Sequence, residues 1–275
     1  MSHSISAKHF NCNACGKCCY GQLPLTIEDA FKNVERFPIC FIWTPLHPTN
    51  KDYRAAKGYG VVIPGANQTE ITVLIVPTSF IPSTLPCPSL QDNNLCGIHE
   101  DKPLRCKTMP FYPYKDERFQ ADLLSPRKGW ECDVSNEAPI VYDEGKIIDR
   151  LAFDNEGAQL RLDVSILQVY ADYMLKYTHG LAGKLSQNST SRNPQQMITS
   201  LSSFLTATRN QNSSDIASKQ LPVLDSFVKK TECEPQLKDF HRYYASWYRE
   251  MEFLSKRKSS LNNYTSEARS ISQQL

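Results

Sequence analysis

The sequence predicts an α+β protein, in which a small cysteine-rich N-terminal region with short hairpins packs with a mainly α-helical C-terminal half. Two observations lead to this fold class. Nine of the ten cysteines lie at or before Cys132, in the part of the chain that also holds most of the prolines and the short β-like runs. From about Leu151 the apolar residues recur at intervals of three or four, which is the period of a helix. We therefore expect a cysteine-cluster metal-binding domain at 1–150 and a helical region at 151–255.

The N-terminal region contains two candidate hairpins. The segments 59–64 and 70–77 are rich in β-branched residues and flank a turn-rich stretch, which predicts two paired strands. The segment 139–150 predicts a second hairpin, with Glu144 and Gly145 at its turn. One short helix is expected before them, with Thr26 as its N-cap and acidic residues in its first turn.

The C-terminal half shows two amphipathic patterns separated by a polar stretch. A linker composition of Ser, Asn, Gln and Pro lies near 186–198, and the residues 256–275 are expected to form a disordered tail. The apolar stripe of the later helix is more typical of a core-facing surface than of a partner-binding one. It consists of Leu237, Phe240, Tyr244, Trp247, Met251 and Leu254.

Composition excludes several classes of partner. A formal net charge of +2 does not favour nucleic acid or an anionic membrane surface. No apolar run approaches the ~20 residues that span a bilayer, and the polar start MSHSISAKHF lacks the apolar core of a signal peptide. We therefore expect a cytoplasmic protein. Thiols stay reduced in that compartment, so clustered cysteines are more typical of metal ligands or redox groups than of structural disulfides.

The motif that carries chemistry is NCNACGKCCYG, at residues 11–21. Cys12, Cys15 and Cys18 follow a Cys-x2-Cys-x2-Cys spacing, by which a tight loop can direct three thiolates at one centre. Gly16 can adopt positive φ in such a loop, and Lys17 can offset thiolate charge. The same spacing serves zinc sites and iron–sulfur clusters.

Cys19 requires a separate explanation. Neighbouring side chains in an extended or turning backbone diverge, so Cys19 is expected to belong to a second centre or to pack behind the first. Four later cysteines bring the total to eight, the number needed for two four-coordinate centres. Redox disulfides and plain packing are the alternatives. The later cysteines are Cys87, Cys96, Cys106 and Cys132.

The ordered motifs CNACGKCC, CPSL, LCGIHEDKPLRCKTMP and GWEC resemble the YkgJ-type cysteine-cluster family. This family is also called CxxCxxCC, a zinc- or iron-chelating domain family related to the flagellin lysine N-methylase domain. The resemblance covers about Asn11 to Cys132. Lys107 departs from it, since many members have Arg at this point. The resemblance implies eight metal ligands, Cys12, Cys15, Cys18, Cys19, Cys87, Cys96, Cys106 and Cys132.

Other candidate residues near the motifs have simpler interpretations. His99 is interpreted as a surface or outer residue more than as a ligand. Lys102 and Arg105 could neutralise a cluster or hold an anion, but solvated charges are the expected role. Cys40 lies among apolar residues and is expected in the core, and Cys233 is expected to be incidental.

These observations predict a metal-binding protein that chelates an iron–sulfur cluster or zinc. We favour iron, because the first triplet is ferredoxin-like and because the methylase relationship suggests more than a structural crosslink. One alternative is a protein N-methyltransferase that uses S-adenosylmethionine. Another is an interaction module crosslinked by structural zinc, with the stripe at 237–254 as its contact surface. No catalytic residue and no protein partner is assigned.

Overall fold

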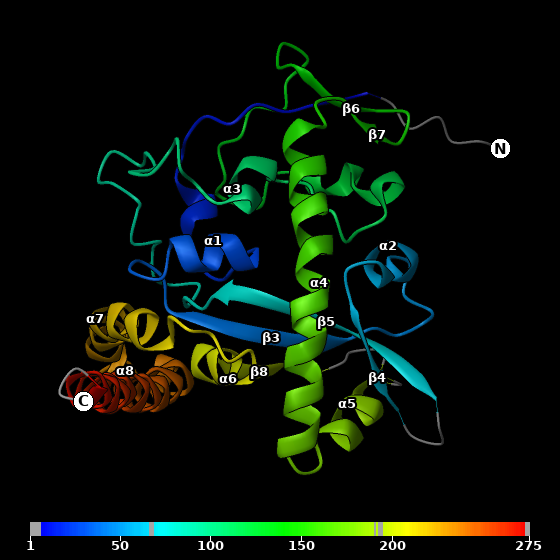
Figure 1. Ribbon diagram of the computed structural model, residues 1–275. Helices are drawn as coiled ribbons and strands as arrows, with labels where there is room; N and C mark the ends of the chain where they lie inside the picture. The colour runs from blue at the N-terminus through cyan, green and yellow to red at the C-terminus, as the bar shows by residue number, and fades with distance from the viewer. Residues whose placement is uncertain (1–6, 66–68, 190, 192–194, 273–275) are drawn as a thin grey trace.

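The computed structural model describes residues 7–65, 69–189, 191 and 195–272, with side chains described as far as residue 256. Within this part of the chain the strands form one five-stranded and one three-stranded sheet, and helices pack around them (Figure 1). All of the strand pairs are antiparallel. The architecture confirms the α+β prediction.

The five-stranded sheet has the order β2-β5-β3-β8, and β4 pairs with β5. Its central strand β3, ICFIWTP, is buried along nearly its whole length, as expected for a strand with both faces covered. The strands of this sheet are β2 (Leu23–Pro24), β3 (Ile39–Pro45), β4 (Val61–Pro64), β5 (Glu70–Ser79) and β8 (Met197–Ser200).

The smaller sheet lies at the N-terminal end of helix α4 (Leu151–Tyr177; Figure 1). It has the order β1-β6-β7 and joins the start of the chain to residues just before α4. Short 3-10 helices, η3 (Glu117–Phe119) and η4 (Ala121–Leu124), lie close to it. Its strands are β1 (Lys8–His9), β6 (Ile140–Asp143) and β7 (Lys146–Ile147).

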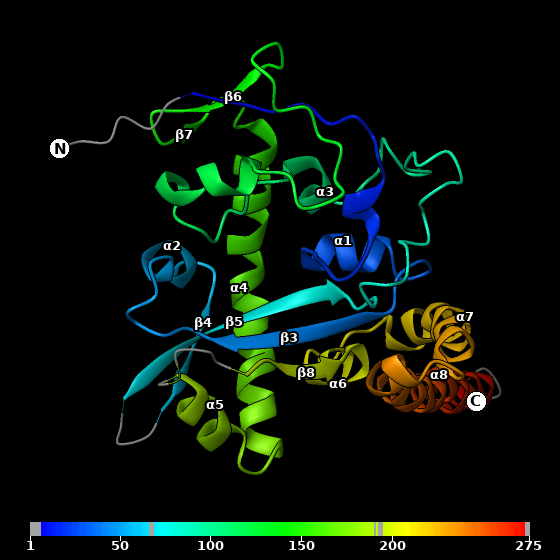
Figure 2. The same ribbon diagram turned by 180° about the vertical axis from the view of Figure 1, so that it is seen from behind.

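The helices surround the larger sheet. Helix α4 crosses the strands in front of the sheet in Figure 1 and behind it in Figure 2, so it covers one face. Helices α7 and α8 pack side by side along one another. The helices are α1 (Ile27–Lys32), α2 (Tyr53–Lys57), α3 (Leu104–Thr108), α4 (Leu151–Tyr177), α5 (Leu181–Ser189), α6 (Leu201–Ala207), α7 (Ser213–Thr231) and α8 (Lys238–Ser272), with η5 (Pro235–Leu237) before the last.

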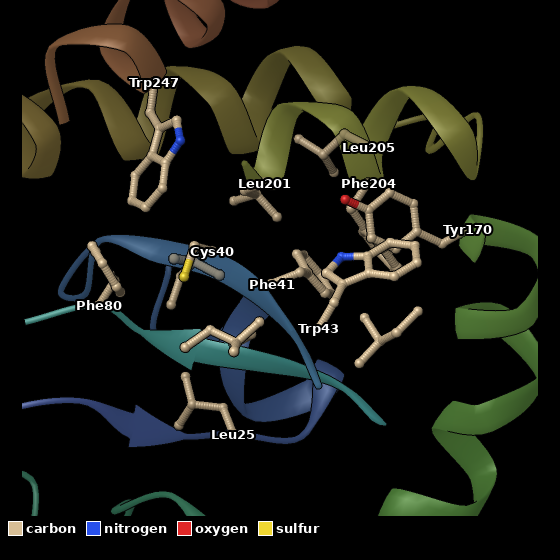
Figure 3. Close-up of a cluster of buried hydrophobic side chains, with 14 of the residues drawn as sticks. Leu25, Cys40, Phe41, Trp43, Phe80, Tyr170, Leu201, Phe204, Leu205 and Trp247 are labelled. Carbon is tan, nitrogen blue, oxygen red and sulfur yellow. The ribbon is translucent and has the colours of Figure 1, made fainter. Parts of the chain in front are cut away.

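One hydrophobic core contains side chains from both halves of the chain (Figure 3). The ring of Phe41 in β3 stacks on that of Phe204 in α6 with 4.4 Å between centroids, and Tyr170 of α4 meets both edge-on. Phe80 packs edge-on against Trp247 of α8 at 5.5 Å. The two halves therefore share a sheet and a core.

Several local predictions are confirmed. Thr26 caps α1, because its Oγ1 accepts a hydrogen bond of 3.0 Å from the amide of Asp29. Strands β4 and β5 form the expected hairpin, although turn residues 66–68 lie outside the described residues. In the β6–β7 hairpin Glu144 and Gly145 have φ of 45° and 79°, as the mirror-image turn of a two-residue hairpin requires.

The segment between α5 and α6 differs from the linker expected near 186–198. Helix α5 continues to Ser189, and β8 begins at Met197 and pairs with β3. Residues 190 and 192–194 lie outside the described residues. Strand β8 was not predicted, because its four residues, MITS, are too short a run to stand out from the polar residues around them. Hydrogen bonding to β3 makes them a strand.

The apolar stripe at 237–254 lies on helix α8 and on the last residue of η5 before it. Tyr244, Trp247 and Met251 are almost fully buried against the sheet side of the protein. This confirms the core-facing interpretation and corrects the alternative in which the stripe is a contact surface for a partner. The backbone of α8 extends as far as Ser272, into the segment expected to form a tail. Among the described helices, none is both long enough and apolar enough to cross a bilayer.

Candidate metal centre

The first cysteine motif forms a tight loop that contains two residues with positive φ. Ala14 and Gly16 have φ of 53° and 71°, and the amide of Cys19 donates to the carbonyl of Gly16 at 3.0 Å, closing the 3-10 turn η1 (Lys17–Cys19). Successive side chains of a 3-10 turn lie about 120° apart, closer than on an extended strand. Cys18 and Cys19 are neighbours on this turn, and each shifts the pKa of the other's thiol.

Cys132 is brought to this loop by a backbone bridge. Asn11 and Asp133 exchange both of their amide–carbonyl hydrogen bonds, at 2.8 and 3.0 Å. The side chain of Asn13 adds a third contact by donating to the carbonyl of Glu131 at 2.9 Å. Cys12 directly follows Asn11, and Cys132 directly precedes Asp133. The paired backbone bonds therefore bring the segments of these two cysteines together.

Cys87 is joined to the other end of the loop. Its amide donates to the carbonyl of Cys19 at 2.7 Å, next to an antiparallel bridge between Tyr20 and Pro86. The CPSL motif is a turn, in which the amide of Leu90 donates to the carbonyl of Cys87 at 2.9 Å. Burial raises the pKa of the Cys87 thiol, and the polar groups of Ser89 and Leu90 in this turn oppose that effect. Such polar groups stabilise a thiolate and are a feature of metal-binding cysteine turns.

Cys96 lies opposite that turn. An isolated bridge pairs Leu90 with Cys96, and the amide of Gly97 donates to the carbonyl of Ser89 at 2.7 Å. The same loop touches the first motif at Gly16, where an added Cβ would lie 3.2 Å from the side chains of both Leu90 and Asn94. Gly16 is therefore needed for its positive φ and also for the close approach of the two segments.

Cys106 is held on the short helix α3. Its amide donates to the carbonyl of Pro103 at 2.9 Å. Burial raises the pKa of the Cys106 thiol against the opposing charge of Lys102, and the same charge adds to the lowering of the pKa of Cys18 that Cys19 causes, so Lys102 acts on thiols from both segments. Its positive charge would favour their thiolate forms. Lys102 was expected to be a solvated charge, and it is instead half-buried.

We sort the eight cysteines into two groups by the backbone bonds that connect their segments and by their effects on one another's pKa, with Cys18 affecting a member of each group. Burial raises the pKa of the Cys132 thiol, and Cys15, Cys12 and Cys18 raise it further. Burial likewise raises the pKa of Cys106 to about 12, with added contributions from Cys87, Cys18 and Cys96. We name the set Cys12, Cys15, Cys18 and Cys132 the first thiol group. We name the set Cys19, Cys87, Cys96 and Cys106 the second thiol group.

Cys18 and Cys19 lie at the junction of the two groups. The hydrogen bond from Cys19 lowers the pKa of Cys18 to about 6, against the opposing effect of burial. The same hydrogen bond, together with burial and the thiols of Cys18, Cys87 and Cys106, raises the pKa of Cys19. Cys18 is therefore the thiol that loses its proton first, and the thiolate is the form that binds metal.

The chemistry of this donor set fits a thiophilic metal. All ten cysteines are free, and each of the eight candidates is exposed or half-buried and therefore accessible. Thiolates are the ligands preferred by zinc and by iron–sulfur clusters. In the part of the chain that the structure describes, no three His, Cys, Asp or Glu side chains already stand around a common point suited to an ion. The groups are loose assemblies that a bound metal would have to close.

The remaining candidates fall outside the two groups. His99 is exposed, and Cys233 is exposed at the end of α7. Cys40 is fully buried in β3, where burial raises the pKa of its thiol, which confirms its place in the core. Arg105, expected in solvent, is instead 1% exposed and lies 3.3 Å from the carboxylate of Glu156. The sequence could not reveal this pair, because Glu156 lies in a distant helix.

Comparison with known proteins agrees with this site. Residues 11–127 match the family CxxCxxCC, described as "Putative zinc- or iron-chelating domain". The match confirms the family resemblance over this segment, which contains seven of the eight candidate ligands; Cys132 lies just beyond it. Searches of curated proteins and of solved structures give no significant match.

Proposed function

We propose that this protein binds metal through its eight clustered cysteines, a proposal supported by the match of residues 11–127 to the CxxCxxCC family, described as "Putative zinc- or iron-chelating domain". The observation that supports the proposal is the backbone bonding that joins the first cysteine loop to Cys87 and, through Asn11 and Asp133, to the segment of Cys132. Four thiolates are the ligand number of a structural zinc site and of an iron–sulfur cluster.

We assign one centre to each group. Cys12, Cys15 and Cys18 are joined by Cys132 through the ladder at Asn11 and Asp133. Cys19 is joined by Cys87 through a direct backbone hydrogen bond and by Cys96 through the bridge between Leu90 and Cys96, and we place Cys106 of α3 in the same centre. This division gives the adjacent cysteines Cys18 and Cys19 to different centres.

Iron–sulfur clusters are the favoured occupants. The spacing of the first triplet is ferredoxin-like, and the positive charge of Lys102 acts on Cys18 and on Cys106, one thiol of each group, which suits the negative charge of a thiolate-bound cluster. A bound iron–sulfur cluster would supply one-electron redox chemistry, whereas zinc would act as a crosslink. We place the protein in the cytoplasm, where its thiols stay reduced.

Anaerobic purification followed by an ultraviolet–visible spectrum and metal analysis tests the identity of the metal. Iron–sulfur centres predict a brown protein that absorbs near 400 nm, with iron and acid-labile sulfide. A colourless protein with stoichiometric zinc would overturn the iron assignment, and a protein that retains neither metal would overturn the proposed function.

Serine variants test the division into centres. Cys15→Ser should lose about half of the metal and keep the second centre, and Cys96→Ser should lose the other half. Cys40→Ser and Cys233→Ser serve as controls and should retain all of it. Complete loss in both Cys15→Ser and Cys96→Ser would show a single shared centre. Loss in the controls would show that the ligands are assigned wrongly.

A further inference from the structure

Three helices around the second thiol group are connected by buried charged side chains that close a ring. Asp163 of α4 accepts a hydrogen bond of 2.8 Å from the amide of Ile27, the first residue of α1. Asp29 of α1 accepts one of 2.9 Å from the amide of Leu104, the first residue of α3. Arg105 of α3 then returns to α4 through its ion pair with Glu156.

Helix α3 depends on these contacts for its position. It has only five residues, and its N-cap, Pro103, offers no side chain to satisfy the free amides of the first turn. Asp29 supplies that acceptor from a different helix. The hydroxyl of Thr108 adds a contact at the other end, donating to the carbonyl of Ala152 in α4 at 3.4 Å. A helix this short has little stability of its own, so its neighbours set its place.

Arg105 is bound on several sides. Its guanidinium lies over the ring of Tyr112, 4.2 Å from the centroid, and donates through Nη2 to the carbonyl of Phe111. Its Nε and Nη1, and Oε2 of Glu156, are buried without a hydrogen-bond partner among the described residues. An incompletely bonded buried ion pair contributes little net stability, because desolvation offsets the attraction. The pair is therefore better explained by the placement of α3 than by stability.

Cys106 directly follows Arg105 and is the only ligand of the second group that α3 carries. Any shift of α3 moves this thiol relative to Cys87 and Cys96, which lie on a separate loop. The first thiol group has no ligand on α3, and it is held by the ladder at Asn11 and Asp133.

We infer that Glu156 and Asp29 are positioning residues for the second metal centre, which they serve by holding α3 and thereby Cys106 in place. This inference rests on the proposed function, since it concerns the same thiols. It deepens that function by making one of the two centres, and not the other, dependent on helices α1 and α4.

The test introduces Glu156→Gln into two backgrounds that each leave one centre. The Cys15→Ser protein retains the second thiol group, and the Cys96→Ser protein retains the first. Cobalt(II) is the probe, because its thiolate complexes absorb strongly, and competition with a chelator of known affinity yields the binding constant. In the Cys15→Ser background, Glu156→Gln should weaken cobalt binding by about 10- to 100-fold, the usual effect of losing a residue that orients a metal ligand. In the Cys96→Ser background the affinity should be unchanged.

Controls separate positioning from general damage to the fold. Asp154→Asn removes a charge from the exposed side of the same helix α4 and should leave both affinities unchanged. Asp29→Asn should reproduce the selective loss to a smaller degree, because an amide oxygen can still accept the bond from Leu104. Equal losses in the two backgrounds, or no loss in either, would overturn the inference. If the parent chain and both backgrounds bind no cobalt, the proposed function itself fails.

Discussion

The carbonyl of Cys19 accepts a hydrogen bond of 2.7 Å from the amide of Cys87, and this bond joins two cysteine-rich segments that lie far apart in the sequence. The adjacent bridge between Tyr20 and Pro86 extends the contact. Backbone groups therefore set the distance between these segments. The thiols are left available for another task, which we propose is metal binding.

Gly16→Ala should reduce the free energy of unfolding by about 1–2 kcal/mol, because a Cβ is strained at φ of 71° and would press on Leu90 and Asn94 at 3.2 Å. Denaturant titration measures the change. Gly58→Ala is the matched control, since φ there is −70° and an added Cβ meets no atom within 4 Å. The control should change stability by less than about 0.5 kcal/mol. Equal destabilisation of both variants would contradict this explanation of Gly16.

Metal removal should loosen the cysteine segments more than the core. Chelation removes the interactions that close the two thiol groups, whereas β3 and α8 are held by apolar burial that no metal supports. Hydrogen–deuterium exchange of metal-loaded and chelated protein measures this. Amides at 11–19 and 87–106 should exchange faster after chelation, and those of β3 should keep their protection. Uniform loss of protection across the chain would contradict the prediction.

Asp163→Asn should make stability less dependent on pH between about 4 and 7. Burial raises the pKa of the Asp163 carboxyl above its ordinary value, with repulsion from Asp29 and Glu28 adding to the effect. A raised folded-state pKa means that the stabilising contribution is present at low pH and is lost as pH rises through that pKa. The variant lacks this loss, and its amide oxygen can still accept from Ile27. Its stability relative to the parent should therefore increase from pH 4 to pH 7, as measured by unfolding at each pH. A difference that is constant with pH would refute the argument.

Trp247→Ala should destabilise the protein by about 3–5 kcal/mol, because the indole is 4% exposed and packs against Phe80. Leu162→Ala on α4, where the side chain is 69% exposed, is the control and should change stability by less than about 0.5 kcal/mol. Thermal unfolding measures both. A Trp247→Ala protein as stable as the parent would contradict the contribution of this stripe to the core.

Local sequence patterns predicted the elements that depend on neighbours in the chain. The cap at Thr26 was predictable because a side-chain oxygen and an amide three residues away form it. The turn at Glu144 and Gly145 was predictable because few residue pairs tolerate two positive φ angles. Strand β8 was not predicted, because its partner β3 is more than 150 residues away along the chain. The periodicity of a sequence does not indicate which distant segment a strand will pair with.

The sequence by itself determined the donor atoms available to the proposed site: eight clustered cysteines, four of them in the CxxCxxCC motif, with the soft-donor character of thiolates. Only the tertiary structure decided how these thiols group and what supports them. Backbone bonds between distant segments pair Cys132 with the first triplet and Cys87 with Cys19, and buried side chains from α1 and α4 hold the helix of Cys106. Residue types set which atoms can bind a metal. Which of them meet depends on long-range hydrogen bonds and on burial, which exist only once the chain has folded.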